Sequence, residues 1–477
     1  MLTDKITAPN SSDSLNRPAQ PWRYFWWFLI TIIVVWQATI CVRNARLNPA
    51  KPDKVSDFTA FYGAGQLALR GQNIYDFKNS EISRRPYLYP ATFAIFPMMP
   101  LALMKHNTAL VVFVILNFML FFATLWLLRD VMWRLIPQTA PPLETSRWMQ
   151  WLRHPDSGVM LAAVICLRFV MSNMRHGNAN MYVAFALALG LWLMLKRRTA
   201  LFEISSGLAI ALGTAIKVTP GLFGLYLLWT WRPWGMLGGA LGLVFFIIIV
   251  PAIPLGFTYS MDRFWEYKNH VASAATGEDA EDDPIGHDGG ADQKQLEGGI
   301  SLRGICMRYM TPRAMKFVFP DKTTKLYYAN IVTLPENTAR NVCRAGELIL
   351  LALTVFLTMR KIARTDPAGI ALSWGLTANA MLLISPLTRK AHVCSFLITA
   401  VVTIALMQQN RITGRARTFC IATLAALCFQ GAIFSVEIIG KLNSDWLQGI
   451  GVGFWLLLAT FASTAWALWK LEQVRDC

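Results

Sequence analysis

Charged residues are scarce in this sequence: Asp, Glu, Lys and Arg together make up 15% of its 477 residues, whereas an ordinary soluble domain has about 25%. A single water-soluble domain is therefore excluded. The 31 Gly and 23 Pro follow no repeat, which excludes a collagen-like chain, and 8 Cys are too few for a disulfide scaffold. Neither Cys-x-x-Cys nor His-Glu-x-x-His occurs, so we expect no metal site and no cofactor.

Apolar runs are what the sequence has in abundance, since 55% of its residues are hydrophobic. A run of about 20 uncharged residues is long enough to cross a bilayer as a helix. Such runs cover residues 24–42, 106–128, 176–195, 234–261, 367–388, 391–410, 418–436 and 446–469. Three weaker runs are 157–174 with Arg168, 345–359 with Glu347, and 204–231, which Lys217-Val-Thr-Pro220 breaks into two short spans. We predict an all-α integral membrane protein with about 12 transmembrane helices.

The distribution of Lys and Arg tests this arrangement, because the cytoplasmic loops of membrane proteins are rich in both. With the N-terminus inside, the short outer loops hold only Arg175, Arg389, Lys390 and Lys441, whereas the inner segments hold several times more. We predict that both termini are cytoplasmic. The membrane topology then accounts for the net charge of +17, so we expect the basic residues to face a lipid bilayer and not nucleic acid.

The chain divides into four parts on this basis. Residues 1–21 are a cytoplasmic N-terminal tail, and 22–256 are an N-terminal transmembrane catalytic module that includes an outer loop at 43–90. Residues 257–344 are a second outer loop, whose acidic, Gly-containing stretch 276–299 predicts a mobile segment. Residues 345–470 are a C-terminal transmembrane module. Cys306 and Cys343 share the second loop, where a disulfide is chemically permitted.

Ionisable residues at membrane depth or at the mouths of spans are the first functional candidates, because polar groups are costly in hydrocarbon. Apolar residues recur at helical spacing over 57–69, which predicts an amphipathic helix on the outer membrane face with Asp57 in its first turn. The residue types alone are equally compatible with structural roles that involve no catalysis. Asp57 fits a helix cap, Lys217 a snorkelling side chain and His392 an interfacial polar group equally well.

The order of several short motifs is more specific than any one of them. The motifs are Asp57-Phe-x-x-Phe-Tyr-x-Ala64, Gly71-x-x-Ile-Tyr-Asp76, Tyr87-x-Tyr-Pro90, His176-Gly-Asn-Ala-Asn180, Ala215-Ile-Lys-Val-Thr-Pro220 and Leu383-Ile-Ser-Pro-Leu387 followed by His392. In this order they resemble glycosyltransferase family 87, the polyprenyl-phosphate-mannose-dependent mannosyltransferases of the GT-C membrane superfamily. The chain departs from the family at Gly177-Asn-Ala-Asn180, where Gly-Gln-x-Asn is more usual, and at Gly299-Ile300, where Asn-Gln is usual.

The resemblance, which spans residues 22–410, implies a GT-C-like helix bundle in a bacterial-type inner membrane, with its active site on the outer face. The implied reaction moves a sugar, expected to be mannose, from a polyprenyl-phosphate donor to a hydroxyl of a glycolipid or glycan acceptor, with inversion. Asp57 matches the family's first-loop aspartate and becomes the general base, with Asp53 as the alternative. The residues expected to bind the donor are Lys217, Arg168, Arg175, His176, Asn178, Asn180, Arg389, His392, Tyr62 and Tyr89.

Two other functions fit the same number of spans. A multi-pass lipid or solute transporter or flippase shares this plan, although residues 22–231 and 235–469 show no clear internal repeat. A polymerase or ligase of lipid-linked glycans would need a large outer loop rich in basic residues. Residues 262–344 contain such residues, namely Arg263, His270, Arg303, Arg308 and Arg313.

Overall fold

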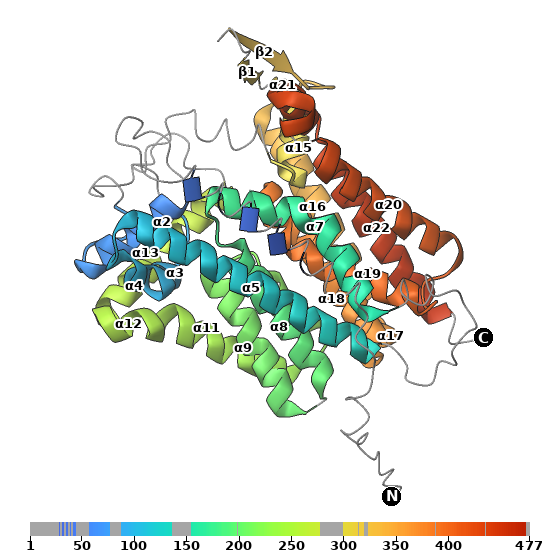
Figure 1. Ribbon diagram of the computed structural model, residues 1–477, viewed down its shortest axis with the longest axis horizontal. Helices are drawn as coiled ribbons and strands as arrows, with labels where there is room; N and C mark the ends of the chain where they lie inside the picture. The colour runs from blue at the N-terminus through green and yellow to red at the C-terminus, as the bar shows by residue number, and fades with distance from the viewer. Residues whose placement is uncertain are drawn as a thin grey trace, which may run out of the picture.

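The computed structural model describes residues 57–76, 87–135, 154–197, 199–276, 299–312, 314–318, 323–386, 388–434 and 436–473, together with single positions between 28 and 43. Residues 1–21, Asp53 and most of the acidic segment 276–299 lie outside the described residues. The described chain is a set of packed helices with one antiparallel two-stranded hairpin, which projects from one end (Figure 1).

The N-terminal half begins with helices that lie in the predicted first outer loop or directly after it. These are α2 (Asp57–Leu69), α3 (Ala91–Phe93), the π-helical turn η3 (Ala94–Met98) and α4 (Met99–Ala102). The bundle helices follow as α5 (His106–Leu135), α7 (Pro155–His176), α8 (Asn180–Lys196), α9 (Ala200–Ile216), α10 (Gly221–Trp229), α11 (Pro233–Val244), η4 (Phe245–Ile249) and α12 (Val250–Leu255). α13 (Phe257–Thr276) then returns to the side of α3.

The C-terminal half starts with α15 (Leu302–Met310) and the hairpin of β1 (Ala314–Val318) and β2 (Thr324–Tyr328), in which Ala314 pairs with Tyr328. The remaining helices are α16 (Glu336–Thr358), α17 (Lys361–Thr365), α18 (Pro367–Ile384), the short η5 (Lys390–Ser395), α19 (Phe396–Gln408), α20 (Gly414–Ile433), α21 (Val436–Gly449) and α22 (Val452–Gln473).

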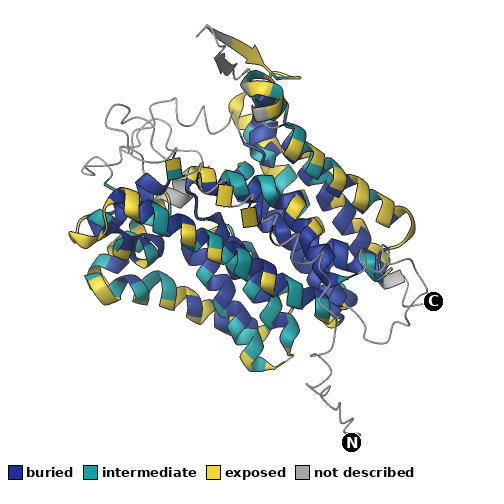
Figure 2. Cartoon of the chain, in the orientation of Figure 1, coloured by how far each residue is buried: buried dark blue, intermediate teal, exposed yellow. Residues whose placement is uncertain are grey.

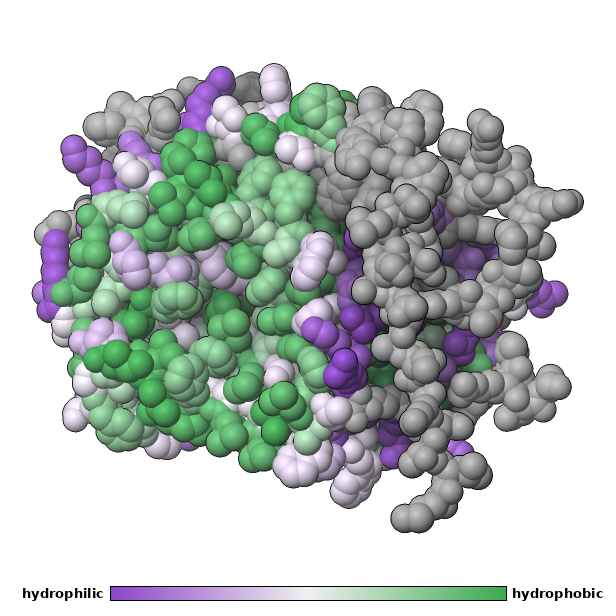
Figure 3. All heavy atoms as spheres, turned by 60° about the horizontal axis from the view of Figure 1, so that its bottom comes forward, coloured by the Kyte–Doolittle hydropathy of each residue, from purple (hydrophilic) through white to green (hydrophobic). Residues whose placement is uncertain are grey.

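Eight helices of the described chain are long and apolar enough to cross a membrane. They are His106–Leu135, Pro155–His176, Pro233–Leu255, Glu336–Thr358, Pro367–Ile384, Lys390–Gln408, Gly414–Ile433 and Val452–Leu471, and α8 and α9 are apolar but shorter. Figure 3 shows a broad apolar surface, as contact with lipid requires. The all-α membrane class is confirmed, and the total of about 12 spans stays a prediction.

Basic residues from separate loops meet at one end of the bundle. Arg134 donates to the carbonyl of Lys196, Arg232 donates to the carbonyl of Arg364, and Arg411 forms an ion pair with Asp366. These residues come from segments that the sequence assigns to the same, cytoplasmic side. The grouping therefore agrees with the predicted order of spans, while the side of the membrane that this end faces stays a prediction.

α2 is the helix that the spacing of apolar residues predicts over 57–69, and it has those bounds. It differs from the prediction in its surroundings. Ten of its 13 residues are buried, so it packs inside the fold and has no polar face on the surface. A Cβ on Gly65 would lie 2.8 Å from the carbonyl oxygen of Met98, which shows how closely α2 approaches η3. Small residues on α2 allow this contact, and hydrophobic spacing alone does not reveal it.

The core of the bundle lies at α18 and α19. In each of these spans 89% of the membrane-length window is buried, against 17% for Pro233–Leu255, and Figure 2 shows the same contrast between α18 and α19 on one hand and α11 and α12 on the other. η5 leads directly into α19. The residues at the start of α19 are therefore carried by the most enclosed part of the molecule.

α9 is held by an unusually close crossing with α11. A Cβ on Gly238 would lie 2.1 Å from the carbonyl oxygen of Ile204, and a Cβ on Gly207 would lie 2.0 Å from that of Gly235. Only Gly permits such an approach, which is a common way of packing helices in membranes. The crossing fixes α9, and the predicted break follows at its end, because α9 stops at Ile216 and α10 starts at Gly221.

Cys306 and Cys343 are free thiols in this structure. Cys343 packs with Met307 and Ala339, and Cys306 lies against that group. The two side chains are hydrogen-bonded to each other. The permitted disulfide is thus not formed here, although the two residues are neighbours on α15 and α16.

Candidate active site

A tight turn between α7 and α8 carries the first part of the site. Gly177 ends α7 in the left-handed conformation, with φ of 61°. The main-chain N–H of Asn178 donates to the carbonyl of Asn173 over 3.0 Å, and α8 begins at Asn180. A Cβ on residue 177 would lie 2.7 Å from the Cβ of Phe58. Gly177 therefore allows the turn to lie directly against the first turn of α2.

This contact places Asp57 beside Asn178. Nδ2 of Asn178 donates to Oδ2 of Asp57 over 2.8 Å. The side-chain carbonyl of Asn178 accepts from the hydroxyl of Tyr89 at 3.1 Å, from the main-chain N–H of Ala179 at 2.8 Å and from Nδ2 of Asn180 at 2.9 Å. Because a main-chain N–H can only donate, Ala179 fixes which end of the Asn178 amide faces Asp57.

Tyr89 supports the same amide from the first outer loop. Burial, and then the negative charge of Asp57, raises the pKa of the Tyr89 hydroxyl above its ordinary value. The hydroxyl therefore stays neutral and keeps its proton for the bond to Asn178. Its ring lies beneath Nζ of Lys217, 5.8 Å from the centroid, which is a cation–π distance.

Lys217 occupies the break between α9 and α10 and contacts residues from two distant parts of the chain. Its Nζ donates to Oδ1 of Asn180 over 3.1 Å and lies 2.9 Å from Nε2 of His392. The other ring nitrogen of His392, Nδ1, accepts from the main-chain N–H of Arg389 over 3.1 Å. Lys217 and His392 are 175 residues apart in the sequence, so the fold alone brings them together.

The site is thus one connected set of polar groups. Asp57 is linked to Lys217 through two asparagine amides, those of Asn178 and Asn180. A carboxylate can accept a proton, and an amine beside an imidazole can hold an anion. The arrangement therefore suits a reaction that takes a proton at one point and stabilises a departing anion at another.

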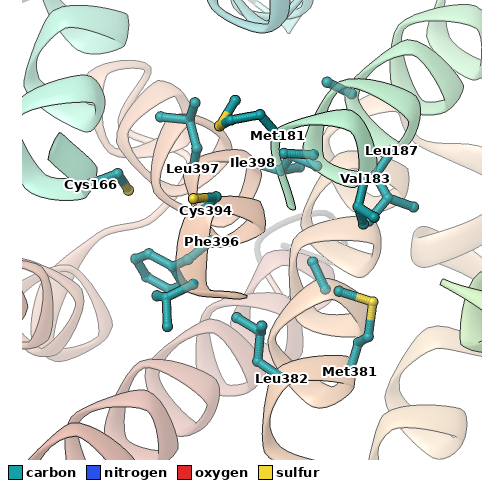
Figure 4. Close-up of a cluster of buried hydrophobic side chains, with 14 of the residues drawn as sticks. Cys166, Met181, Val183, Leu187, Met381, Leu382, Cys394, Phe396, Leu397 and Ile398 are labelled. Atoms are coloured by element: carbon teal, nitrogen blue, oxygen red, sulfur yellow. The ribbon is translucent and has the colours of Figure 1, made fainter. Parts of the chain in front are cut away.

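A small cavity lies where Lys217 faces His392. Its volume is about 10 Å³, room for no more than one water molecule. Met381 and Leu382 of α18 contribute to its wall, and Figure 4 shows these two residues in the buried cluster that also contains Cys394. The polar set therefore borders the apolar core on the side of α18.

The comparison with family models identifies the segment that carries much of this set. Residues 87–281 match the model of glycosyltransferase family 87. The protein is accordingly a membrane glycosyltransferase. The crystal structure of ArnT from Cupriavidus metallidurans in the apo state is also similar, with a TM-score of 0.37 and 11% identity over 93% of this chain and 77% of that one. The comparison with curated proteins gave no match.

The family 87 segment does not contain the whole polar set. Tyr89, Asn178, Asn180 and Lys217 lie inside residues 87–281. Asp57 precedes the segment and His392 follows it, yet both are hydrogen-bonded or in contact with its residues. The fold therefore extends the polar set beyond this segment on both flanks.

Two other predicted donor-binding residues have contacts elsewhere in the described chain. Arg168 packs against Gly431 of α20, where a Cβ would lie 3.3 Å from the Arg168 Cβ. The hydroxyl of Tyr62 donates to the carbonyl of Met104 over 2.7 Å. Their contacts in the described chain hold helices together, and their roles in donor binding stay predictions.

The remaining predicted residues lie near the set at the exposed end of α7 and before η5. Arg175 and His176 are exposed, and Nδ1 of His176 lies 2.7 Å from the carbonyl of Ser172. Arg389 contributes its main chain to His392, while its side chain is exposed. Asp53, the alternative base, lies outside the described residues. In the described chain no three His, Cys, Asp or Glu side chains come together as a metal would require.

Two buried asparagines that the sequence did not suggest also belong to the polar set. Asn173 of α7 and Asn117 of α5 are 0% and 2% exposed. Oδ1 of Asn173 accepts from the main chain and side chain of Asn180, and Nδ2 of Asn173 donates to Oδ1 of Asn117 over 3.2 Å. A single asparagine inside an apolar span was the available signal, since uncharged polar residues are also costly in hydrocarbon.

The Gly299-Ile300 pair, which departs from the family motif, lies in the segment before α15. The main-chain N–H of Ile300 donates to the carbonyl of Thr388 over 2.8 Å, and Oγ of Ser301 donates to that of Pro386 over 3.0 Å. Arg308 is 2% exposed and donates to the carbonyl of Gly299. The segment therefore braces the loop that leads to His392.

An apolar groove of about 740 Å³ lies beside α5. Its lining residues are Val35, Thr39, Val42, Arg43, Val111, Val114, Ile115, Phe118, Met119 and Phe122. Residues 57–69 and 91–104 pack tightly against each other at Gly65 and Met98, and they do not line this groove.

Proposed function

We propose that this glycosyltransferase transfers mannose from a polyprenyl-phosphate donor to a hydroxyl of a glycolipid or glycan acceptor on the outer face of a bacterial-type inner membrane. The observation that carries the proposal is the position of Asp57. Its carboxylate is held by the Asn178 amide, and the same hydrogen-bonded set reaches Lys217 and His392. Asp57 is the general base, and Lys217 and His392 bind the phosphate.

The proposed reaction needs one carboxylate. The acceptor hydroxyl gives its proton to Asp57 as its oxygen forms a bond to C1 of the sugar. The bond between C1 and the phosphate oxygen breaks, and its electron pair leaves with the polyprenyl phosphate. A single displacement inverts the configuration at C1, and it requires no second carboxylate of the kind that a glycoside hydrolase uses.

The leaving phosphate gains negative charge, so it needs positive charge and N–H donors in place of a general acid. Nζ of Lys217 and Nε2 of His392 supply them. Because the cavity between these groups holds only about one water molecule, the phosphate must enter between them and replace their mutual contact. The Tyr89 ring then supports Lys217 from the side of Asp57.

The isoprenoid chain of the donor is proposed to lie in the groove beside α5. The groove is lined mostly by apolar side chains, and Arg43 is among its lining residues. α5 begins at His106, whose Nε2 lies 3.4 Å from Oγ1 of Thr59 on α2. α5 therefore contacts both the groove and the helix that carries the general base.

The position of this site on the outer face is part of the proposal and rests on the topology expected from the sequence. Both termini are proposed to be cytoplasmic, because Arg134, Arg232 and Arg411 gather at the end of the bundle opposite to the polar set. The site also draws on both proposed modules, since Lys217 belongs to residues 22–256 and His392 to 345–470. The module 22–256 alone would lack one of the two phosphate-binding groups.

The two rival functions receive less support. The family 87 segment at residues 87–281 favours an enzyme over a transporter or flippase. A polymerase or ligase would use the basic residues of the second outer loop, but Arg263 pairs with Glu266, Arg303 pairs with Glu347, and Arg308 holds a main-chain carbonyl. These three side chains have structural partners.

The test is transfer of radiolabelled mannose from polyprenyl phosphate into acceptor lipids by membranes that contain the wild-type protein or a variant. Asp57→Asn retains a good helix cap but cannot accept a proton, so we expect a loss of roughly 10²- to 10⁴-fold, the usual range for a general base. Donor binding should be unchanged. Asp262→Asn, the same substitution at an exposed residue of α13, is the control and should keep wild-type transfer. Transfer by Asp57→Asn at the control rate would exclude Asp57 as the base.

A further inference from the structure

Four buried asparagines form a chain of side-chain amides whose direction is fixed by the main chain. Asn117, Asn173, Asn178 and Asn180 are all 6% exposed or less. An amide has a donor end and an acceptor end, and a buried chain of amides is stable only if every donor faces an acceptor. The direction of such a chain can therefore be worked out from any group that can only donate or only accept.

Two main-chain groups determine the direction at the inner part of the chain. The carbonyl of Phe113 can only accept, and it lies 3.0 Å from Nδ2 of Asn117. Asn117 must therefore present its Oδ1 to Asn173. The main-chain N–H of Asn180 can only donate, and it lies 3.1 Å from Oδ1 of Asn173, so Asn173 must present its Nδ2 to Asn117. Both constraints give the same orientation.

The orientation of Asn180 follows from that of Asn173. The two hydrogens of Nδ2 of Asn180 are directed to Oδ1 of Asn173 at 3.2 Å and to Oδ1 of Asn178 at 2.9 Å. Only Oδ1 of Asn180 remains for Lys217, and it accepts from Nζ at 3.1 Å. If Asn180 were turned over, its NH₂ group would face the amine and its oxygen would face two other oxygens.

The far end of the site is fixed by the main chain as well. The main-chain N–H of Arg389 can only donate, and it bonds to Nδ1 of His392. The proton of the neutral ring is then on Nε2, which lies 2.9 Å from Nζ of Lys217, so a protonated amine and this N–H are two donors that face the same anion site. Every hydrogen bond from Lys217 to Phe113 points one way. The chain is a single ordered unit because a reversal at one member would place like groups together at the next.

We infer that Asn117 and Asn173 are positioning residues, which hold Asn180 in the orientation that presents its oxygen to Lys217 and its amide to Asn178. This inference rests on the proposed function, because Lys217 is assigned there to the donor phosphate. Neither asparagine touches Asp57 or Lys217. Their effect on the reaction passes through Asn180, which holds the amine where the leaving phosphate needs it.

The substitution that separates this role from a merely structural one is Asn173→Asp. A neutral carboxylic acid accepts at one oxygen and donates from the other, so it reproduces the amide. An ionised carboxylate cannot donate, and it would place two oxygens together at Asn117. Asn173→Asp should therefore transfer sugar at nearly the wild-type rate at low pH and lose activity as the pH rises. The matched control is Asn379→Asp, because Asn379 is 0% exposed and bonds to Thr460 of α22 at 3.1 Å.

The experiment measures kcat/KM for a polyprenyl-phosphate sugar across pH 6 to 9 with the purified full chain, together with the thermal midpoint at each pH. We expect the ratio of variant to wild-type kcat/KM to fall about tenfold or more across this range for Asn173→Asp, since one buried hydrogen bond to a charged group is worth about that factor. The ratio for Asn379→Asp should stay level. A level ratio for Asn173→Asp, or an equal fall in the control, would overturn the inference.

A second variant covers the case in which Asn173→Asp does not fold. Asn117→Leu has a similar volume and removes the end of the chain, so we expect a loss of about tenfold in kcat/KM at every pH, whereas Asn379→Leu should lose stability and keep its rate. Equal rates for these two variants would overturn the inference. If the wild-type protein transfers no sugar, the proposed function is wrong. If the wild-type protein transfers sugar but the Asn117 and Asn173 variants have the same rates as their Asn379 controls, only the positioning role is wrong.

Discussion

Gly177 offers the sharpest test of how the fold holds Asp57 in place. A Cβ at this position would lie 2.7 Å from the Cβ of Phe58, whereas ordinary contact begins at 3.4 Å. In Gly177→Ala the turn and the start of α2 must therefore move apart by about 0.7 Å or more. Asn178 follows residue 177 and Asp57 precedes Phe58, and Nδ2 of Asn178 lies 2.8 Å from Oδ2 of Asp57 in the wild-type structure. The movement therefore pulls Asn178 and Asp57 apart.

Two costs follow from the substitution, and they are separable. The left-handed backbone costs an alanine about 1 to 2 kcal/mol of stability. The displacement acts on the reaction, because a misplacement of about 1 Å in a catalytic group can cost roughly 10²-fold in rate. We therefore expect Gly177→Ala to fold with a modestly lower thermal midpoint and to transfer sugar about 100 times more slowly.

Gly71→Ala is the matched control. Gly71 also has a positive φ, 66°, but no atom lies within 4 Å of the place its Cβ would take. This variant carries the backbone strain without the clash, so its thermal midpoint should fall similarly and its rate should stay near that of the wild type. Initial rates of mannose transfer and thermal midpoints of the purified proteins decide the matter. Equal rates for the two alanine variants would show that the Gly177 contact does not position Asp57.

Two further substitutions test the donor site. Ile115→Trp fills the groove beside α5, so KM should rise for a donor with a long isoprenoid chain and stay unchanged for a donor with a short chain. The control is Leu241→Trp, at an exposed position of α11. Equal KM values for the two variants would show that the isoprenoid chain binds elsewhere. Lys217→Met removes the amine that faces the phosphate and should lower kcat/KM by about 10²- to 10³-fold, whereas Lys470→Met at the basic end should not. Wild-type kinetics for Lys217→Met would exclude Lys217 from the site.

Much of the fold was predictable because the membrane restricts what a sequence can do. Runs without charge gave the spans, and Pro220 after Lys217 gave the break between α9 and α10. The bounds of α2 followed from the spacing of its apolar residues. Its burial did not, because the contact between Gly65 and Met98 depends on how two segments approach each other in three dimensions.

The candidate site was predictable where its residues stand in motifs. Asp57, Asn178, Asn180, Lys217 and His392 were all proposed from the sequence, and the structure joins them in one hydrogen-bonded set. Motif spacing gives no information about which face of a long helix a side chain occupies.

Arg168 illustrates this limit, because its place on α7 does not reveal that its Cβ packs against Gly431 of α20, and its role in donor binding stays a prediction. Asn117 and Asn173 are residues of the polar set that the sequence did not suggest. They belong to no motif, and only the packing of α5 against α7 makes them partners. Sequence reasoning therefore finds the ends of a buried polar chain more readily than its middle.

The most direct test of the account is a product analysis with purified wild-type protein, a polyprenyl-phosphate mannose donor and an extract of membrane glycolipids as acceptors. Mass spectrometry should show acceptor lipids that are heavier by one hexose, with an equal amount of free polyprenyl phosphate, and neither product should form with Asp57→Asn. Unchanged acceptors with intact donor, or equal product from wild type and Asp57→Asn, would contradict the claim that this protein transfers a sugar with Asp57 as its base.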